Sequence, residues 1–436
     1  MSTLAEHSVS PAARAVPHQP RHIAGRTAAP RRTCIACSAG DLERVLDLGA
    51  APLVLGETLA DDTPMTAPLR LARCRGCAVL QLEDTRSRQA RDLIATAASL
   101  RTFAGRPDCA RRFCEQAIDR WRLRGEGHVI EIGSATGSLL RFFHAWQLPV
   151  LGIEPDPQLS RYARMRRIPT WRAMFDAEVA ERISRAGMHA DLVIMSTPIG
   201  ACDDLPALLA ALSTVLRPGG VVALDMPDAL RVVGRTRIDG LRHSDPLLAS
   251  IDQLQHMLAV HDLDLVDVER TAETVGERLR VWACRRQDGA GPEPHPRVRT
   301  RLRAERANAI DDRAAVSAFA GRVDLVHRQI RGLLDDARSA HRSVALWGTS
   351  PVAVAIAAAA GIDRRHADFA VETDACSTRM VLHGTGIPVL ASADVADRRP
   401  DLVLALDDLR HQPPGWEGVP VYAVDDLIDV VHRVRG

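Results

Sequence analysis

A glycine-rich turn near residue 131 constrains the fold of this chain more than any other sequence feature. The turn, EIGSATG at 131–137, follows the strand-like run HVI and leads into the helix-like run SLLRFFHAW. Glycines at such a turn let the backbone approach a ligand, and the helix N-terminus offers unpaired N–H groups. The next strand, PVLGIE, ends at Glu154, where a carboxylate can accept both ribose hydroxyls. The pattern predicts a Rossmann-like nucleotide-binding fold, although it is not the GxGxxG fingerprint and many such folds carry a similar turn.

Strand-like and helix-like segments keep alternating along the middle third of the chain, at 108–285. ADLVIMS is a buried strand that ends at Ser196, and LRPGGVVALDMP at 216–227 supplies a turn and a further strand after a helix. Alternation of this kind is typical of an α/β domain built on a parallel sheet. We therefore expect an α/β domain at 101–288.

Four of the nine cysteines form two C-x-x-C pairs, CIAC and CRGC. A C-x-x-C turn brings two thiolates to one ion, and two such turns complete a tetrahedral four-cysteine zinc site. No coordination position stays open, so the zinc is expected to be structural; four unrelated buried cysteines are the alternative. The odd cysteine count and the lack of a secretory signal argue against a disulfide framework. We expect a small zinc domain at 33–100 whose ligands are Cys34, Cys37, Cys74 and Cys77.

The C-terminal third, 289–436, predicts a linker helix and a second α/β domain. A Gly/Pro-rich linker precedes a helical stretch whose apolar residues recur every three or four positions, which predicts core packing or, alternatively, a dimer seam. These residues are Val316, Phe319, Val323, Val326, Ile330 and Leu333. Short apolar runs such as VALW, ADFAVE and DLVLAL then predict strands of a Rossmann-like domain. The turn Gly348-Thr349-Ser350 is either an anion-binding helix start or a structural turn.

Composition excludes several classes of function. The 56 basic residues against 55 acidic ones leave a net charge of +1, which gives no electrostatic grip on nucleic acid or on anionic membranes. All the cations are arginine, so Schiff-base and P-loop chemistry is excluded. Residues 1–32 lack an apolar signal core and are expected to be a disordered tail, with an organelle transit peptide as the alternative. No apolar run is long enough for a transmembrane helix, and we expect a cytoplasmic protein.

The glycine turn, the strand-end glutamate and the L-R-P-G-G turn before a strand together resemble class I S-adenosylmethionine-dependent methyltransferases. The resemblance implies that the cofactor is bound by Glu131, Gly133, Ser134, Gly137, Glu154, Met174, Phe175 and Ser196. Glu131 and Gly133 would face the methionine end, and Glu154 would hold the ribose. Met174 and Phe175 would lie beside the adenine, with plain core packing as the alternative.

The whole arrangement resembles the C-methyltransferases of deoxysugar biosynthesis. The likeness includes CIAC…PLRLARCRGCAVLQL, VIEIGSATGSLL, PVLGIEPDP, LRVWAC and VALWGTSPVA. It implies an α/β fold in which a class I methyltransferase Rossmann-like domain is flanked by a small four-cysteine zinc domain and a second, C-terminal Rossmann-like domain. Members of that family methylate a carbon next to a ketone in nucleotide-linked 4-keto sugars. A base removes an acidified C–H, and the enolate attacks the sulfonium methyl group.

This chain departs from the family at the residues that transfer the proton. Where family members carry Tyr-His-Glu-His, this chain reads Arg242, His243, Ser244 and Asp245, and only the first histidine is kept. A further tyrosine of the family falls within ATAASLRTF at 95–103, which contains none. The two tyrosines of the chain, at 162 and 422, lie in other segments.

His243 is the candidate base, since an unperturbed histidine titrates near pH 6.5. Asp245 is its expected orienting partner and Arg242 completes the candidate catalytic set; a solvated loop histidine is the alternative. We expect a methyltransferase that acts on a carbon of a small molecule in specialised metabolism, with S-adenosylmethionine and structural zinc as its cofactors. The alternatives are a non-catalytic partner protein with this fold and an O- or N-methyltransferase. No nucleic-acid or membrane partner is expected, and the oligomeric state stays open.

Overall fold

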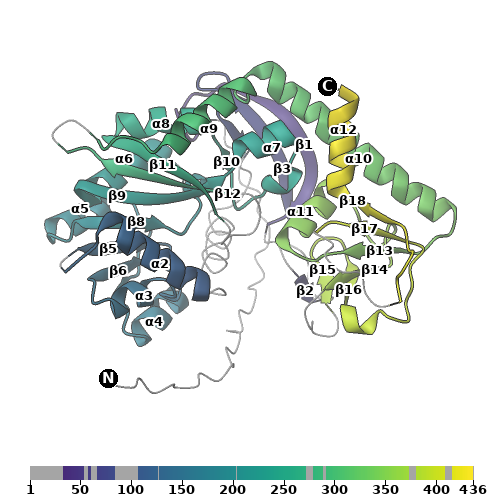
Figure 1. Ribbon diagram of the computed structural model, residues 1–436, viewed down its shortest axis with the longest axis horizontal. Coiled ribbons are helices and arrows are strands. Elements are labelled where there is room, and N and C mark those ends of the chain that lie inside the picture. Colours follow the sequence, from purple (N-terminus) through teal and green to yellow (C-terminus); the bar gives the residue numbers. More distant parts are fainter. Residues whose placement is uncertain are drawn as a thin grey trace.

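The computed structural model describes residues 33–53, 57–59, 66–83, 107–125, 127–202, 204–271, 278–287, 291–372, 380–407 and 415–435. These residues form three sheets with helices packed around them (Figure 1). The expected tail at 1–32 and the segment 95–103 lie outside the described residues. The domain boundaries given above stay predictions.

The central sheet has seven strands in the order β11-β12-β9-β8-β5-β6-β7. Its strands are β5 (His128–Ile132), β6 (Val150–Ile153), β7 (Thr170–Trp171), β8 (Ala190–Met195), β9 (Leu216–Pro227), β11 (Leu263–Thr271) and β12 (Arg278–Arg285). β12 is antiparallel to both of its neighbours, while the pairs from β9 to β7 are parallel. The helices that follow the chain here are α2 (Pro107–Trp121), α3 (Leu140–Ala145), α4 (Pro157–Met165), α5 (Ala177–Arg185), α6 (Leu205–Val215), α7 (Ala229–Arg235) and α8 (Ile251–Val260). The predicted α/β fold of the middle region is confirmed.

The strands of the central sheet are apolar on both faces, as β5 illustrates. Its side chains alternate between the two faces, and both faces are covered by helices. Ile130 and Ile132 belong to one buried cluster, whereas Val129 belongs to the cluster on the opposite face. Glu131 shares the face of Val129 by this alternation, and it is the polar exception at the carboxyl end of the strand.

The N-terminal sheet is antiparallel and includes one strand from the middle of the chain. Its order is β1 (Leu42–Pro52), β3 (Thr66–Cys74), β4 (Leu80–Leu82) and β10 (Leu247–Leu248). β10 lies between α7 and α8 in sequence, and it forms the edge of a sheet whose first strand starts about 200 residues earlier. The sequence analysis did not anticipate this exchange, because a two-residue strand carries no periodic signal.

The C-terminal sheet has the order β18-β17-β13-β14-β16-β15-β2. Its strands are β13 (Val344–Trp347), β14 (Phe369–Glu372), β15 (Met380–Leu382), β16 (Ile387–Ala391), β17 (Leu402–Ala405), β18 (Val421–Ala423) and the N-terminal β2 (Glu57–Leu59). The five strands from β18 to β16 are parallel and follow the Rossmann order 3-2-1-4-5 when counted from β13. The predicted second Rossmann-like domain is therefore confirmed. Its helices are α11 (Pro351–Ala359) and α12 (Val424–Arg435), and α9 (Pro296–Ala307) and α10 (Arg313–Ser339) lead into it.

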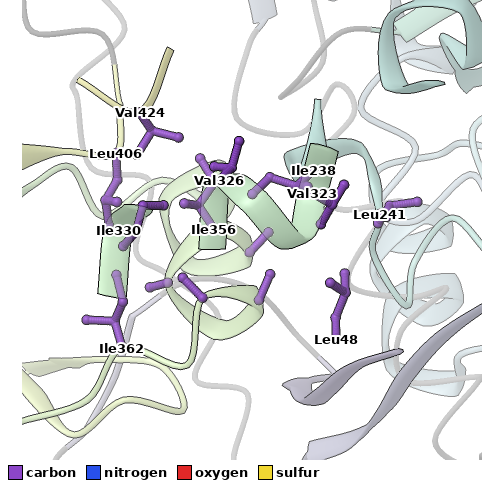
Figure 2. Close-up of a cluster of buried hydrophobic side chains, with 14 of the residues drawn as sticks. Leu48, Ile238, Leu241, Val323, Val326, Ile330, Ile356, Ile362, Leu406 and Val424 are labelled. Carbon is purple, nitrogen blue, oxygen red and sulfur yellow. The ribbon is translucent and has the colours of Figure 1, made fainter. Parts of the chain in front are cut away.

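The apolar stripe of α10 lies in the core that joins the N-terminal and C-terminal sheets. Val323, Val326 and Ile330 are fully buried, and Figure 2 draws them in one cluster with Ile238 and Ile356. Leu333 is partly buried, and Leu334 takes the fully buried position. Each such side chain contributes roughly 1.5–3 kcal/mol on burial. Core packing, rather than a dimer seam, is the interpretation that the structure supports.

No helix within the described residues is long and apolar enough to cross a bilayer.

Candidate active site

The glycine turn after β5 adopts the backbone that its sequence predicts. Gly133 and Gly137 have φ of 73° and 72°, and Ala135 between them also lies in the left-handed region at 46°. A Cβ added at Gly137 would lie 3.1 Å from Ile168, a tight contact that adds to the strain that its positive φ would impose on another residue. The turn brings the backbone to the carboxyl edge of the central sheet, where ligands bind in open α/β sheets.

Glu131 is a buried acid directly before this turn. Ser196, which follows β8, donates a hydrogen bond from its Oγ to Glu131 Oε1 at 2.7 Å. Burial raises the pKa of Glu131 to about 8 despite this hydrogen bond, so the side chain carries a proton at neutral pH. Among the described residues, Glu131 Oε2 and the neighbouring Ser134 Oγ have no hydrogen-bond partner.

Glu154, at the end of β6, is joined directly to the glycine turn. Its Oε2 accepts from the Ala135 N–H at 2.8 Å, and its Oε1 accepts from the Asp156 N–H at 2.9 Å. Burial raises the pKa of Glu154, and the two backbone N–H groups counteract part of that rise. Each carboxylate oxygen can accept a second hydrogen bond, so the acid can still bind two ligand hydroxyls.

Together these residues leave buried polar atoms beside the glycine turn that can bind a polar ligand. The orphaned oxygens at Glu131 and Ser134 are buried polar atoms that need a partner, since an unsatisfied buried polar atom costs about 1–3 kcal/mol. Gly152 on β6 supports the same turn, because a Cβ at this position would lie 2.4 Å from Ser134 Oγ. Gly152 was not among the predicted site residues, although a glycine inside the apolar run PVLGIE is a sign of close backbone approach.

Met174 and Phe175 lie between β7 and α5. Met174 is 47% exposed, whereas Phe175 is half-buried and packs against the core cluster on the α5 and α6 side of the sheet. Phe175 therefore serves the core at least in part, and Met174 remains accessible.

The candidate catalytic loop, 242–246, is buried between η2 (Ile238–Gly240) and β10. His243 Nε2 lies 3.1 Å from the backbone oxygen of Ala67 in the N-terminal sheet. A carbonyl oxygen can only accept, so this contact makes Nε2 the protonated nitrogen and leaves Nδ1 as the basic nitrogen of the neutral ring. The Ala67 carbonyl thus orients His243, a role that the sequence analysis gave to Asp245.

Asp245 instead belongs to a chain of alternating buried charges. Arg278 at the start of β12 donates to Asp245 at 2.7 Å and to Asp225 at 2.9 Å, and the Arg242 guanidinium lies 3.5 Å from Asp245. Burial opposes ionisation of Asp245, but the charges of Arg278 and Arg242 outweigh it and lower its pKa. Asp245 is therefore an anion at neutral pH.

Asp225 connects the catalytic loop with the cofactor-binding residues. Ile132 of β5 pairs with Met195 of β8, and Met195 pairs with Leu224 of β9. The next position on each strand places Ser196 beside Asp225 at the carboxyl edge of the sheet. Asp225 and Arg278 were missed by the sequence analysis, because an acid inside VVALDMP becomes informative only when its partner is known.

The four cysteines meet in one cluster, with all four sulfurs within 4.8 Å of one another. The Cys34–Cys77 and Cys37–Cys74 sulfur distances are both 3.6 Å. A tetrahedron with sulfurs about 2.3 Å from a central ion has edges of about 3.8 Å, so the cluster fits such an ion. The residue after each C-x-x-C pair, Ser38 or Ala78, has φ of 61°.

The turn Gly348-Thr349-Ser350 in the C-terminal sheet starts α11. Ser350 caps this helix and donates its Oγ hydrogen bond to Asp407, and the Ser350 N–H donates to the other oxygen of the same carboxylate at 3.1 Å. The Asp407 side chain therefore occupies the position at the helix N-terminus that an anion would take, which favours the structural interpretation of this turn.

Two family models match the chain. A model described as a methyltransferase domain matches residues 106–290, and one described as a C-methyltransferase C-terminal domain matches residues 273–407.

Several known proteins are similar to this chain. C-methyltransferase NovU of Streptomyces niveus is 27% identical over 382 residues, which cover 86% of this chain and 89% of that protein. Malonyl-(acyl-carrier protein) O-methyltransferase of Serratia marcescens is 27% identical over 185 residues, which cover 41% of this chain and 71% of that protein. Among solved structures, magnesium protoporphyrin IX methyltransferase of Synechocystis PCC 6803 aligns with a TM-score of 0.30 and 13% identity, over 42% of this chain and 80% of that one. The chain is an S-adenosylmethionine-dependent methyltransferase and is similar to C-methyltransferases: one part matches a methyltransferase domain and the part that follows matches a C-methyltransferase C-terminal domain.

Proposed function

We propose that this protein methylates an acidic carbon next to a ketone in a small molecule of specialised metabolism, with a nucleotide-linked keto sugar as the first acceptor to test. The proposal is supported by the similarity to a C-methyltransferase over most of both chains. One observation carries the assignment of the base: His243 is buried and held through Nε2 by the Ala67 carbonyl.

The cofactor-binding residues in this proposal are Glu131, Gly133, Ser134, Gly137, Glu154, Met174, Phe175 and Ser196. Glu154 accepts the ribose hydroxyls, and the turn at 133–137 lets the backbone approach the methionine end. Glu131 keeps its proton at neutral pH, so it can donate a hydrogen bond through the oxygen that has no described partner. When bound, S-adenosylmethionine supplies an electrophilic methyl group.

His243 removes the acceptor proton in this proposal. Nδ1 carries the lone pair of the neutral ring, and the proton that it takes makes the ring a cation whose Nε2–H stays on the Ala67 carbonyl. The Arg242 guanidinium stabilises the enolate oxygen that forms, while Asp245 keeps Arg242 and Arg278 in place. A fixed cation lowers the need for the tyrosine that the family uses at this step.

The four-cysteine cluster holds zinc in this proposal. Four thiolates are soft ligands that fill all positions of a tetrahedral site, so the ion has no coordination position for a substrate. Its role is structural.

The test is methyl transfer from S-adenosylmethionine labelled with ¹³C in the methyl group to a panel of nucleotide-linked 4-keto sugars and keto acids. NMR of the product is expected to show a new C–CH₃ group, and His243→Gln is expected to lower the rate at least 100-fold, within the range for removal of a general base. His256→Gln, at an exposed histidine on α8, is the matched control and keeps the rate. A label on oxygen or nitrogen, or an active His243→Gln variant, would overturn the assignment.

A further inference from the structure

The four-cysteine cluster is attached to the central region at three places around the catalytic loop. The Leu205 N–H at the start of α6 donates to the backbone oxygen of Ile35 at 3.0 Å. Gln253, in the first turn of α8, donates from Nε2 to the backbone oxygen of Cys77 at 3.4 Å. The third attachment is the pairing of β4 with β10. The first C-x-x-C turn therefore contacts the start of α6, and the second contacts α8, which follows β10 and the loop at 242–246.

Gln81 on β4 joins one C-x-x-C turn to β10. Its side chain is fully buried, and its Oε1 accepts from the Ile35 N–H at 2.9 Å while its Nε2 donates to the Thr33 oxygen at 3.3 Å. The same residue pairs with Leu247 of β10. The Gln81 side-chain amide thus contacts the backbone on both sides of Cys34. The residue itself lies on β4, the strand that pairs with β10.

The catalytic loop is fixed to the N-terminal sheet at both ends. At its start, His243 contacts the Ala67 oxygen at the beginning of β3. At its end, the Leu82 N–H of β4 donates to the Pro246 oxygen at 2.8 Å, directly before β10. The position of the loop therefore depends on the positions of β3 and β4. β3 ends at Cys74, and β4 follows the second C-x-x-C turn.

We propose that Gln81 is a positioning residue that transmits the geometry of the metal-bound C-x-x-C turns to the loop that carries His243. A buried amide is satisfied only while the turn at 33–37 keeps its fold, because Ile35 and Thr33 are its partners. Loss of the metal or of the amide contacts then loosens β4 and β10, whereas the cofactor turn at 131–137 has no such link among the hydrogen bonds described above. This inference rests on the proposed role of His243.

Hydrogen–deuterium exchange tests the link without any acceptor. Three samples of the full chain are compared: zinc-loaded wild type, metal-free wild type and zinc-loaded Gln81→Met. The methionine has a similar length and no hydrogen-bonding amide, so the expected result is exchange of peptide 242–248 that is faster by roughly tenfold. Exchange at 131–137 and the affinity for S-adenosylhomocysteine are expected to stay unchanged. Gln116→Met, at an exposed glutamine on α2, is the matched control and changes neither peptide.

A second variant shows how far exchange at 242–248 responds to displacement of β10 when the metal site is unchanged. Gly200 lies against β10, and a Cβ there would be 2.4 Å from the Leu247 Cβ, so Gly200→Ala displaces the strand from its other side. This variant is expected to speed exchange at 242–248 while zinc content stays at one per chain. If Gly200→Ala speeds exchange there and metal-free protein and Gln81→Met do not, the link through Gln81 is refuted.

The rate of methyl transfer then separates this inference from the proposed function. Gln81→Met is expected to lower kcat at least fivefold with unchanged cofactor affinity. A variant that loses cofactor affinity in proportion to its rate would show a general loss of structure and would refute positioning. Absence of carbon methylation by wild type would refute the proposed function alone, since the exchange result does not depend on it.

Discussion

Replacement of Arg278 by methionine tests whether the buried charges hold the catalytic loop. The Arg278 side chain is 8% exposed and bridges Asp225 and Asp245, whose side chains are 12% and 3% exposed. Removing one partner of a buried ion pair costs about 3–5 kcal/mol, because a buried charge is left uncompensated. We therefore expect Arg278→Met to lower the free energy of unfolding by about 3–5 kcal/mol, measured by urea denaturation at pH 7. Arg242 stays beside Asp245, which favours the lower end of this range.

A double variant separates the charge effect from loss of packing. In Arg278→Met/Asp225→Asn, the carboxylate whose ion pair was with Arg278 is gone, so the double variant is expected to be more stable than Arg278→Met alone. Arg306→Met is the matched control, since Arg306 is 71% exposed in its pair with Asp252, and it is expected to cost less than about 1 kcal/mol. If Arg278→Met costs no more than this control, or if the two substitutions are additive, the account of the buried charges is wrong.

Three further predictions concern the cofactor turn and the cysteine cluster. Because burial raises the pKa of Glu131 from 4.5 to about 8, the folded protein keeps a proton that the unfolded chain releases, and stability falls as pH rises through that window. In urea denaturation without cofactor, the free energy of unfolding of wild type is expected to fall between pH 6 and pH 8 by about 2 kcal/mol more than that of Glu131→Gln. The same pH dependence in both proteins would contradict this. Gly152→Ala forces Ser134 to move, so we expect S-adenosylhomocysteine to bind at least tenfold more weakly in calorimetry. An unchanged affinity would contradict this prediction. Cys74→Ser is expected to reduce bound zinc from one per chain towards zero in elemental analysis and to destabilise the chain; full zinc retention would exclude Cys74 as a ligand.

The fold and the cofactor turn were predictable because their signals are local. The glycines at 133 and 137 indicate a backbone with positive φ, which other residues rarely adopt, and Glu154 follows at the end of the next strand. The spacing of the cysteines likewise specifies a cluster without knowledge of the rest of the chain.

The partners of the candidate catalytic residues were not predictable, because they come from distant segments. Asp245 is close to His243 in sequence, yet it forms its ion pair with Arg278 from a distant strand. His243 is oriented by a backbone oxygen, and a backbone oxygen is present in every residue type, so the sequence does not mark it. The pairing of β10 with β4 joins segments about 165 residues apart, and it is this long-range contact that brings the cysteine cluster to the catalytic loop.

In the proposed reaction, this chain transfers a methyl group to carbon with His243 as the base. The most direct measurement is ¹³C NMR of the product formed from methyl-labelled S-adenosylmethionine and a nucleotide-linked 4-keto sugar, for wild type and His243→Gln side by side. The account predicts a new C–CH₃ signal in wild type that falls at least 100-fold in the variant while binding of S-adenosylhomocysteine is retained. Transfer to oxygen or nitrogen, or carbon transfer that survives in His243→Gln, would contradict it.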